Sequence, residues 1–218
     1  MPIRTGPVVV PTAVIKRLPM YYRYLQVLVD QGLERVSSRE LSQLMGITSS
    51  QLRQDLSYFG EFGQQGYGYK VTELYQAICE ILGIEKQYKT VLVGVGNLGR
   101  ALINYQGFSR RGLNLKGIFD NNPAIIGENI NDFTVRSVEE LRPYLQKEAI
   151  QIGVITTPAS AAQKIADLLI AGGVTGIWNF APQHINVPED VIVENTHIGD
   201  GLLSLFFKMK HQERLELK

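Results

Sequence analysis

The chain of 218 residues has little cysteine and little histidine, with one Cys and three His. A single thiol, Cys79, excludes an internal disulfide framework and a cysteine-rich metal site, and no metal ligand set is predicted. No apolar run reaches the roughly 18 residues that a bilayer-spanning helix needs. The N-terminus also lacks the apolar core and the small-residue cleavage site of a secretory signal. These absences favour a cytoplasmic globular protein.

Catalytic groups are equally scarce. The three histidines, His184, His197 and His211, come late in the chain and have no partnered acid or nucleophile in a recognisable arrangement. A dehydrogenase needs a proton donor or acceptor beside the nicotinamide. We therefore expect no catalytic residues and no enzyme activity. The alternative left open is a small NAD-dependent oxidoreductase with a helical partner-binding domain.

Charge is nearly balanced overall, at +1, but it is not evenly distributed. Residues 1–60 carry seven basic and four acidic side chains. That local excess is compatible with binding to phosphates, although it is a weak signal alone.

The first part of the chain, residues 11–83, has the pattern of short helices. Pro11 and Pro19 each stand where a helix can begin, and apolar residues at helical spacing after Pro19 predict a helix that ends at Gly32. Residues 37–40 form a capping box that opens a helix ending at Gly46.

Residues 48–51 form a second capping box, which opens a helix through Phe59. A longer helix followed by two short ones around a tight turn predicts a helix-turn-helix. Four glycines alternate with aromatic residues over 59–71, which favours a tight β-hairpin and hence a winged helix. A helix over 72–82 closes this domain, and residues 83–89 form a linker.

The pattern changes at Lys89, where apolar runs of strand length begin to alternate with helices. Alternation of this kind predicts βαβ units in a doubly wound parallel sheet. The predicted strands are 90–95, 116–120, 150–155 and 176–179, and the predicted helices are 98–105, 137–145 and 159–171. The predicted fold class is thus α/β, with an N-terminal winged-helix domain (1–85), a doubly wound Rossmann domain (86–200) and a C-terminal helix (201–218).

A nucleotide site is predicted where the first strand of the sheet ends. Gly94, Gly96 and Gly99 match G-x-G-x-x-G directly after a strand and at the start of a helix. Gly94 suits the tight turn, Gly96 the close approach of a pyrophosphate, and Gly99 the packing of helix on strand. The phosphates would meet the free N–H groups of the helix N-terminus.

Asp120 ends the second predicted strand, where an acid can accept hydrogen bonds from both adenosine ribose hydroxyls. The residues that follow it offer no arginine for a 2′-phosphate, so NADH and NAD+ are expected rather than NADP(H). A sensor of another nucleotide, such as CoA, stays an alternative. Residues 156–158 and 179–181 end the next two strands at the same rim, although helix capping and a plain turn explain them equally well. The predicted cofactor-binding residues are Gly94, Val95, Gly96, Asn97, Leu98, Gly99, Asp120, Thr156, Thr157, Pro158, Asn179, Phe180 and Ala181.

Several segments in the same order resemble the Rex family of redox-sensing repressors: residues 53–60, 66–69, 94–99, 104–108 and 179–182. The resemblance covers nearly the whole chain. It implies a homodimer that binds a palindromic, AT-rich operator. NADH binding is expected to release the dimer from DNA, and NAD+ is expected to favour the DNA-bound form.

Residue by residue, the resemblance implies a recognition helix over 49–59 and a wing over 64–69. Gln54 departs from the basic residue that is common in the family, and Asp55 is expected to hold the domain together rather than to meet phosphate. The implied DNA-binding residues are Ser49, Ser50, Arg53, Gln54, Ser57, Tyr58, Gln64, Gln65, Gly66, Tyr67 and Tyr69.

The resemblance also implies switch residues that couple ligand state to DNA binding: Arg23, Tyr105 and a third group supplied by the other subunit. His197 stands where the family has an acid, and Asp200 follows three residues later. The tail after Gly201 places apolar residues on nearly every side of a helix, which favours burial between two subunits. Burial of that helix within its own domain is the alternative.

Overall fold

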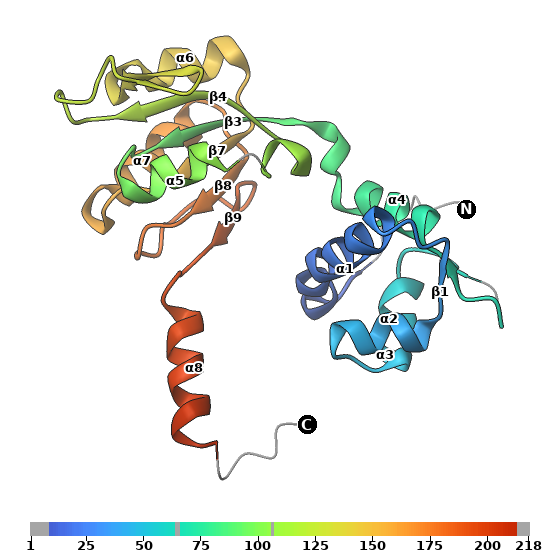
Figure 1. The fold of residues 1–218 in the computed structure, drawn as a ribbon. Coiled ribbons are helices and arrows are strands. Elements are labelled where there is room, and N and C mark those ends of the chain that lie inside the picture. Colours follow the sequence, from blue (N-terminus) through green and yellow to red (C-terminus); the bar gives the residue numbers. More distant parts are fainter. Residues whose placement is uncertain (1–8, 64–65, 106, 213–218) are drawn as a thin grey trace. The chain divides into compact units, whose positions relative to one another are not determined.

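The computed structural model describes residues 9–63, 66–105 and 107–212. The chain divides into two compact units, Met1–Lys86 and Gln87–Lys218, and each is described by itself (Figure 1). Within the described ranges, every helix is too short or too polar to cross a bilayer.

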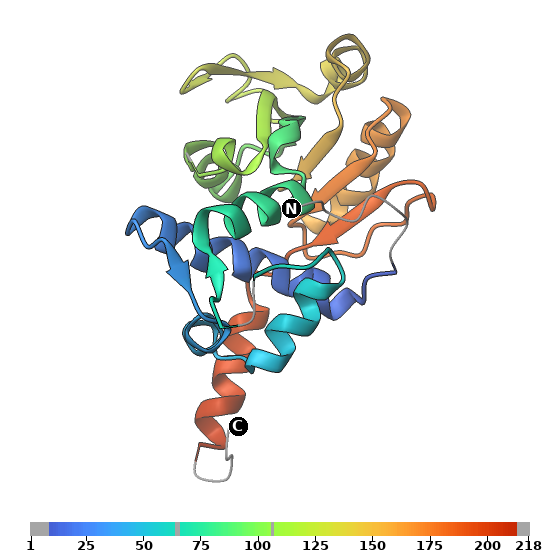
Figure 2. The same cartoon turned by 90° about the vertical axis from the view of Figure 1, so that its right-hand side faces the viewer.

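The first unit is a helical domain with one small two-stranded sheet (blue to blue-green in Figures 1 and 2). Its core is formed by fully buried side chains such as Leu25, Leu41, Leu52 and Ile78. Its elements are α1 (Thr12–Asp30), β1 (Arg35–Val36), α2 (Ser38–Met45), α3 (Ser49–Ser57), β2 (Tyr69–Lys70) and α4 (Val71–Leu82).

The capping box predicted for α2 is confirmed, whereas α3 has only one of the two predicted capping bonds and ends at Ser57 rather than at Phe59. The Ser37 hydroxyl accepts from the Glu40 N–H at 3.1 Å, and the Glu40 carboxylate accepts from the Ser37 N–H at 2.8 Å. Gly46 ends α2 with φ of 67°, a conformation that glycine adopts at little cost. Thr48 then caps α3, its hydroxyl accepting from the Gln51 N–H at 3.2 Å.

Two details of this unit differ from the prediction. Pro19 does not begin a helix but lies inside α1, which starts after Pro11. Burial explains this: Val14 and Leu18 extend the buried stripe of the same helix, and that packing outweighs the backbone bond that proline removes. In the described part of 59–71, the strand is β2, which pairs with β1 rather than within a hairpin of its own.

The second unit is a doubly wound sheet in the order β5-β6-β4-β3-β7-β8-β9. Neighbouring strands are parallel except for the β5–β6 pair. The strands are β3 (Tyr88–Val93), β4 (Leu113–Asp120), β5 (Asn129–Ile130), β6 (Phe133–Ser137), β7 (Ile152–Ile155), β8 (Gly176–Asn179) and β9 (Ile192–Asn195). The helices are α5 (Asn97–Asn104), α6 (Leu141–Glu148), α7 (Ala159–Ala171) and α8 (Asp200–Lys210), with short 3-10 turns at Ser109–Arg111 and Val138–Glu140; a further 3-10 turn, Ile84–Lys86, ends the first unit.

The central strand β3 shows why both faces are covered. Val91 and Val93 pack on one face, in a cluster with residues of α6 and α7. Leu92 points to the other face and packs in a cluster that includes Leu102 and Ile103 of α5. Strand order reverses at β3, with β4 on one side and β7 on the other, and ligands of such sheets bind at the carboxyl ends beside this point.

Helix α8 differs from every other long helix, because none of its described residues is buried. Its large apolar side chains are at least half exposed: Leu202, Leu203, Leu205, Phe206, Phe207 and Met209. Burial of this helix within its own domain, one of the two alternatives from the sequence, is therefore wrong.

Candidate functional site

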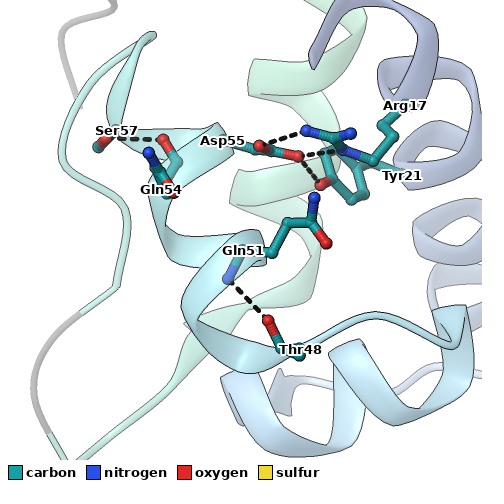
Figure 3. Close-up of polar contacts among 7 residues, drawn as sticks. All are labelled: Arg17, Tyr21, Thr48, Gln51, Gln54, Asp55 and Ser57. Carbon is teal, nitrogen blue, oxygen red and sulfur yellow. Dashed lines mark hydrogen bonds and ion pairs between the residues drawn. The ribbon is translucent and has the colours of Figure 1, made fainter. Parts of the chain in front are cut away.

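Helix α3, the predicted recognition helix, separates its residues by face (Figure 3). Leu52, Asp55 and Leu56 are buried, whereas an outer face of four side chains at helical spacing is exposed. That face consists of Ser50, Arg53, Gln54 and Ser57. Ser49 and Tyr58, also predicted to contact DNA, are half-buried, and the Ser49 hydroxyl is 2.9 Å from that of Ser42.

Asp55 is the one charged residue of α3 that turns inward, toward α1 (Figure 3). Its carboxylate accepts from Arg17 Nε at 2.6 Å and from Arg17 Nη2 at 2.8 Å, and it also accepts from the Tyr21 hydroxyl. Asp55 is only 3% exposed. This arrangement ties α3 to α1, as expected for a residue that holds the domain together.

The electrostatics of this cluster keep Asp55 ionised. Burial by itself would raise the pKa of the Asp55 carboxyl, but hydrogen bonds from Arg17 and Tyr21 and the Arg17 charge hold it below its usual range. Burial and the bond to Asp55 raise the pKa of Tyr21, so the phenol stays a donor.

A hollow of about 610 Å³ lies between α2, α3 and the wing segment. Arg53 lines it, and its Nη1 donates to the Ser38 hydroxyl at 3.1 Å. Arg35 donates to the Tyr67 carbonyl at 3.2 Å and so holds the backbone of the predicted wing at that residue. Gln64 and Gln65 lie outside the described residues. Neither Ser38 nor Arg35 carries a sequence signal that distinguishes it from any exposed polar residue.

The remaining wing residues have different surroundings. Tyr67 is 69% exposed and Gly66 is exposed, so both are accessible. Tyr69, in contrast, is 5% exposed and packs in the core of the first unit. Its burial raises the pKa of the phenol. Its side chain therefore stabilises the domain, and the prediction that it is an accessible DNA contact is wrong.

The glycine loop between β3 and α5 has the geometry that its spacing predicts. Gly94 has φ of +104°, and a Cβ there would lie 2.7 Å from the backbone carbon of Thr156. A Cβ on Gly99 would overlap the Gly94 carbonyl oxygen. At Gly96, a Cβ would meet no described atom within 4 Å, so the backbone at this position faces open space.

A cleft of about 860 Å³ opens at the carboxyl ends of β3, β4, β7 and β8. Its size suits a small organic ligand or dinucleotide. Among the predicted cofactor residues, those that line it are Gly94, Val95, Gly96, Asn97, Leu98, Asp120, Thr156, Thr157, Pro158 and Phe180. Thus residues from four separate segments meet at one site.

Two side chains show what this cleft can bind. Asp120 accepts from the Val95 N–H at 2.6 Å and from the Asn122 N–H at 2.8 Å, which holds its carboxylate at the rim. Each carboxylate oxygen keeps further acceptor capacity for a hydroxyl. The Thr157 hydroxyl is buried without a hydrogen-bond partner among the described residues. A buried polar atom of this kind calls for a ligand or water.

Three predicted cofactor residues lie behind the lining instead of on it. Gly99 packs against Gly94, and Ala181 is buried. Asn179 is fully buried, its amide donating to the Gln183 carbonyl and to Asn195 Oδ1 at 2.9 Å while its own oxygen accepts from the Ala181 N–H. These residues shape the rim.

Tyr105 is held by three neighbours beyond the glycine loop. Its hydroxyl accepts from Arg111 Nη1 at 2.9 Å, and the Arg111 guanidinium lies 5.6 Å from the ring centroid. Its ring lies close over Gly107, where a Cβ would meet ring carbon Cε1 at 2.5 Å. Its edge-to-face contact with Phe108 has a centroid distance of 4.7 Å.

A row of aromatic contacts continues from Tyr105 to the cleft. Phe108 contacts Trp178 at 5.4 Å between centroids, and Trp178 contacts Phe180, a lining residue, at 4.6 Å. The other two switch candidates, Arg23 and His197, are exposed on their respective units.

Sequence reasoning missed two cations of the cleft. Arg100 and Lys164 both line it. Arg100 follows Gly99 directly, so the glycine motif itself indicates its place on the first turn of α5. Lys164 lies in the middle of α7, and no motif marks it. The residues that follow Asp120 offer no arginine, as expected, but Arg100 from the other side of the glycine loop lines the same cleft as Asp120.

Comparison with known proteins supports both units. Residues 85–183 match the family described as "CoA binding domain", and residues 9–57 match the family described as "Putative DNA-binding protein N-terminus". Among solved structures, RSP in complex with β-NAD+ and operator DNA is 48% identical, with a TM-score of 0.89 and 95% of both chains covered. RSP in complex with β-NADH is 45% identical, with a TM-score of 0.88 and coverage of 95% of this chain and 97% of that one.

Curated relatives agree over nearly the full length. The redox-sensing transcriptional repressor Rex of Clostridium perfringens (strain SM101 / Type A) is 49% identical over 201 residues, covering 92% of this chain and 95% of the relative. That of Clostridium kluyveri is 52% identical over 193 residues, covering 88% and 92%. This chain belongs to the Rex family of redox-sensing transcriptional repressors.

Proposed function

We propose that this protein is a DNA-binding transcriptional repressor, not an enzyme, that senses the ratio of NADH to NAD+ in the cytoplasm. NADH in the cleft of the second unit releases it from operator DNA, and NAD+ favours the DNA-bound state. The observation that carries the proposal is that one chain holds both a glycine-loop cleft and a recognition helix with an exposed polar face.

The residues of the cleft fit a dinucleotide. Gly96 leaves open space where a pyrophosphate must approach the helix N-terminus. Asp120 supplies acceptors for ribose hydroxyls, and the unpartnered Thr157 hydroxyl can bond to the ligand. CoA shares the ADP portion of NAD, but it carries a phosphate on the ribose, which the Asp120 carboxylate would repel.

The outer face of α3 suits the major groove, where Arg53 and Gln54 can form bidentate bonds with guanine and adenine respectively. The wing residues Gly66 and Tyr67 reach the adjacent backbone or minor groove. We infer that two copies bind a palindromic, AT-rich operator, with α8 buried against the second copy. The exposed apolar side chains of α8 support this pairing, since a lone surface helix rarely exposes so many.

Coupling between the two sites is assigned to Arg23, Tyr105 and His197, with Asp200 as the alternative to His197. NADH can shift the protein away from DNA only by as much as it prefers the released state.

A gel-shift assay with palindromic AT-rich DNA tests the function, with NADH and NAD+ titrated separately. We expect NADH to release DNA at concentrations where NAD+ does not. The Gly96→Arg variant places a bulky side chain in the open space before α5, so it should stay on the operator when NADH is added. Absence of specific DNA binding with either ligand would refute the proposal, and a test for dehydrogenase activity would follow.

A further inference from the structure

Arg100 stands beside the acid that marks the ribose end of the cleft. It projects from the first turns of α5 and lines the cleft together with Asp120, Asn122 and Ile125. Hydrogen bonds to Glu128 raise the pKa of the Arg100 guanidinium, and the nearby Asp120 charge adds to that effect. An arginine at this place could bind a ribose phosphate, because its planar fork matches phosphate in two parallel bonds.

Glu128 occupies that fork instead. Arg100 Nη1 donates to Glu128 Oε1 at 3.1 Å, and Nη2 donates to Oε2 at 2.6 Å. The backbone of Glu128 is fixed on both sides: its N–H donates to the Ile125 carbonyl at 3.0 Å, and its carbonyl accepts from the Val135 N–H at 2.9 Å. Of the described residues, Glu128 is not among those that line the cleft. Its hydrogen bonds therefore reach the cleft lining through Arg100.

We propose that Glu128 determines specificity in the cleft: by holding Arg100, it keeps the site selective for NAD(H) over NADP(H). Asp120 disfavours a 2′-phosphate by repulsion, and Glu128 withdraws the cation that would compensate for it. Selectivity thus depends on two carboxylates, of which only one faces the ribose. This inference rests on the proposed dinucleotide function of the cleft.

The test measures the binding of NADH and of NADPH to the full-length protein. The fluorescence of each reduced nicotinamide reports the binding. In Glu128→Gln, the side chain keeps its size but loses its charge and one of its two acceptor oxygens, so it holds Arg100 less strongly and leaves the guanidinium more available to a ribose phosphate. We expect the ratio of the NADPH to the NADH dissociation constant to fall about tenfold, with NADH affinity changed less than about twofold.

Two further variants make the result specific. Glu140→Gln breaks a pair with Arg136, in which neither residue lines the cleft, and should leave the ratio unchanged. The double variant Arg100→Gln/Glu128→Gln should lose the gain in NADPH affinity, because the released cation is gone.

An unchanged ratio in Glu128→Gln, or a gain that persists in the double variant, would overturn the role of Glu128 while the proposed function stands. Failure of the unaltered protein to bind NADH would overturn the proposed function itself, and this inference with it. Thermal unfolding of each variant shows whether the fold is kept.

Discussion

The two surfaces that we propose to meet phosphate-bearing partners, the outer face of α3 and the glycine loop before α5, are built from different groups. On α3, exposed side chains form the surface, and a buried ion pair behind them holds the helix in place. In the loop, backbone forms the surface, and the required feature is the absence of side chains at Gly94, Gly96 and Gly99. A surface made of side chains tolerates exchange at single positions, whereas a surface made of backbone depends on each glycine.

The largest effect should therefore come from a single methyl group in the loop. In Gly99→Ala, the new Cβ overlaps the Gly94 carbonyl oxygen, so helix and loop must separate. We expect the free energy of unfolding to fall by about 3 kcal/mol, which lowers the Tm. We also expect NADH to bind about 100-fold more weakly. Gly176→Ala is the matched control, since its Cβ would find the nearest described atom at 3.5 Å. Equal NADH affinity in the two variants would contradict the backbone-built site.

The buried pair behind α3 gives the next effect. Asp55→Asn leaves the Arg17 guanidinium, whose side chain is only 24% exposed, without its counter-charge. We expect the free energy of unfolding to fall by about 3 kcal/mol at neutral pH, measured by urea denaturation. Asp30→Asn changes an exposed acid on the same domain. It should lower the free energy of unfolding by only about 0.3 kcal/mol.

The contribution of Asp55 to stability should depend on pH, and the Asp55→Asn variant measures that dependence. Because the folded pKa of Asp55 lies below its unfolded value of about 3.9, its contribution is full above that value and is lost as the pH falls through the folded pKa. The stability difference between the unaltered protein and Asp55→Asn should shrink in acid. A difference that stays constant from pH about 7 to about 3 would show that the carboxylate charge contributes nothing.

On the exposed face, a single side chain should have a smaller effect. Arg53→Ala should weaken operator binding by about 2 kcal/mol and, where the contact is to phosphate, reduce the salt slope by about one. Arg142→Ala removes an exposed arginine from α6 and is the control. Unchanged affinity and salt slope in Arg53→Ala would place DNA elsewhere on the first unit.

The smallest effect is expected where the two sites are coupled. Arg111→Ala removes the donor that holds the Tyr105 hydroxyl, so the operator affinity should change less between NADH-bound and NADH-free protein. We expect that ratio of affinities to fall about fivefold, by fluorescence anisotropy. Arg110 is also exposed but has no side-chain hydrogen bond to a described residue, so Arg110→Ala should behave as the unaltered protein does. If both variants behave alike, Arg111 has no part in positioning Tyr105.

The same contrast explains what the sequence could predict. Three glycines at fixed spacing after an apolar run specify a turn, a close approach and a helix contact, and all three positions have the predicted geometry. The parallel sheet follows from the alternation of apolar runs with helices, although the short strands β5 and β6 were missed because two to five residues carry little periodicity.

Side-chain partnerships could not be predicted in this way. The pairing of Arg100 with Glu128 joins residues 28 positions apart, and that of Arg17 with Asp55 joins residues 38 apart. Both depend on how elements pack, which local propensity does not contain. Pro19 shows the same limit, since a residue that ends most helices lies inside α1, where buried neighbours on both sides stabilise the helix.

We propose that one cleft binds both NADH and NAD+ and transmits their ratio to the DNA-binding face. The most direct test is fluorescence anisotropy of a labelled operator while NADH is titrated at several fixed concentrations of NAD+. If both ligands compete for the cleft lined by Gly96 and Asp120, the NADH concentration at half-release rises in proportion to NAD+ once NAD+ saturates the site. A half-release point that does not move with NAD+ would contradict a single shared site and, with it, ratio sensing.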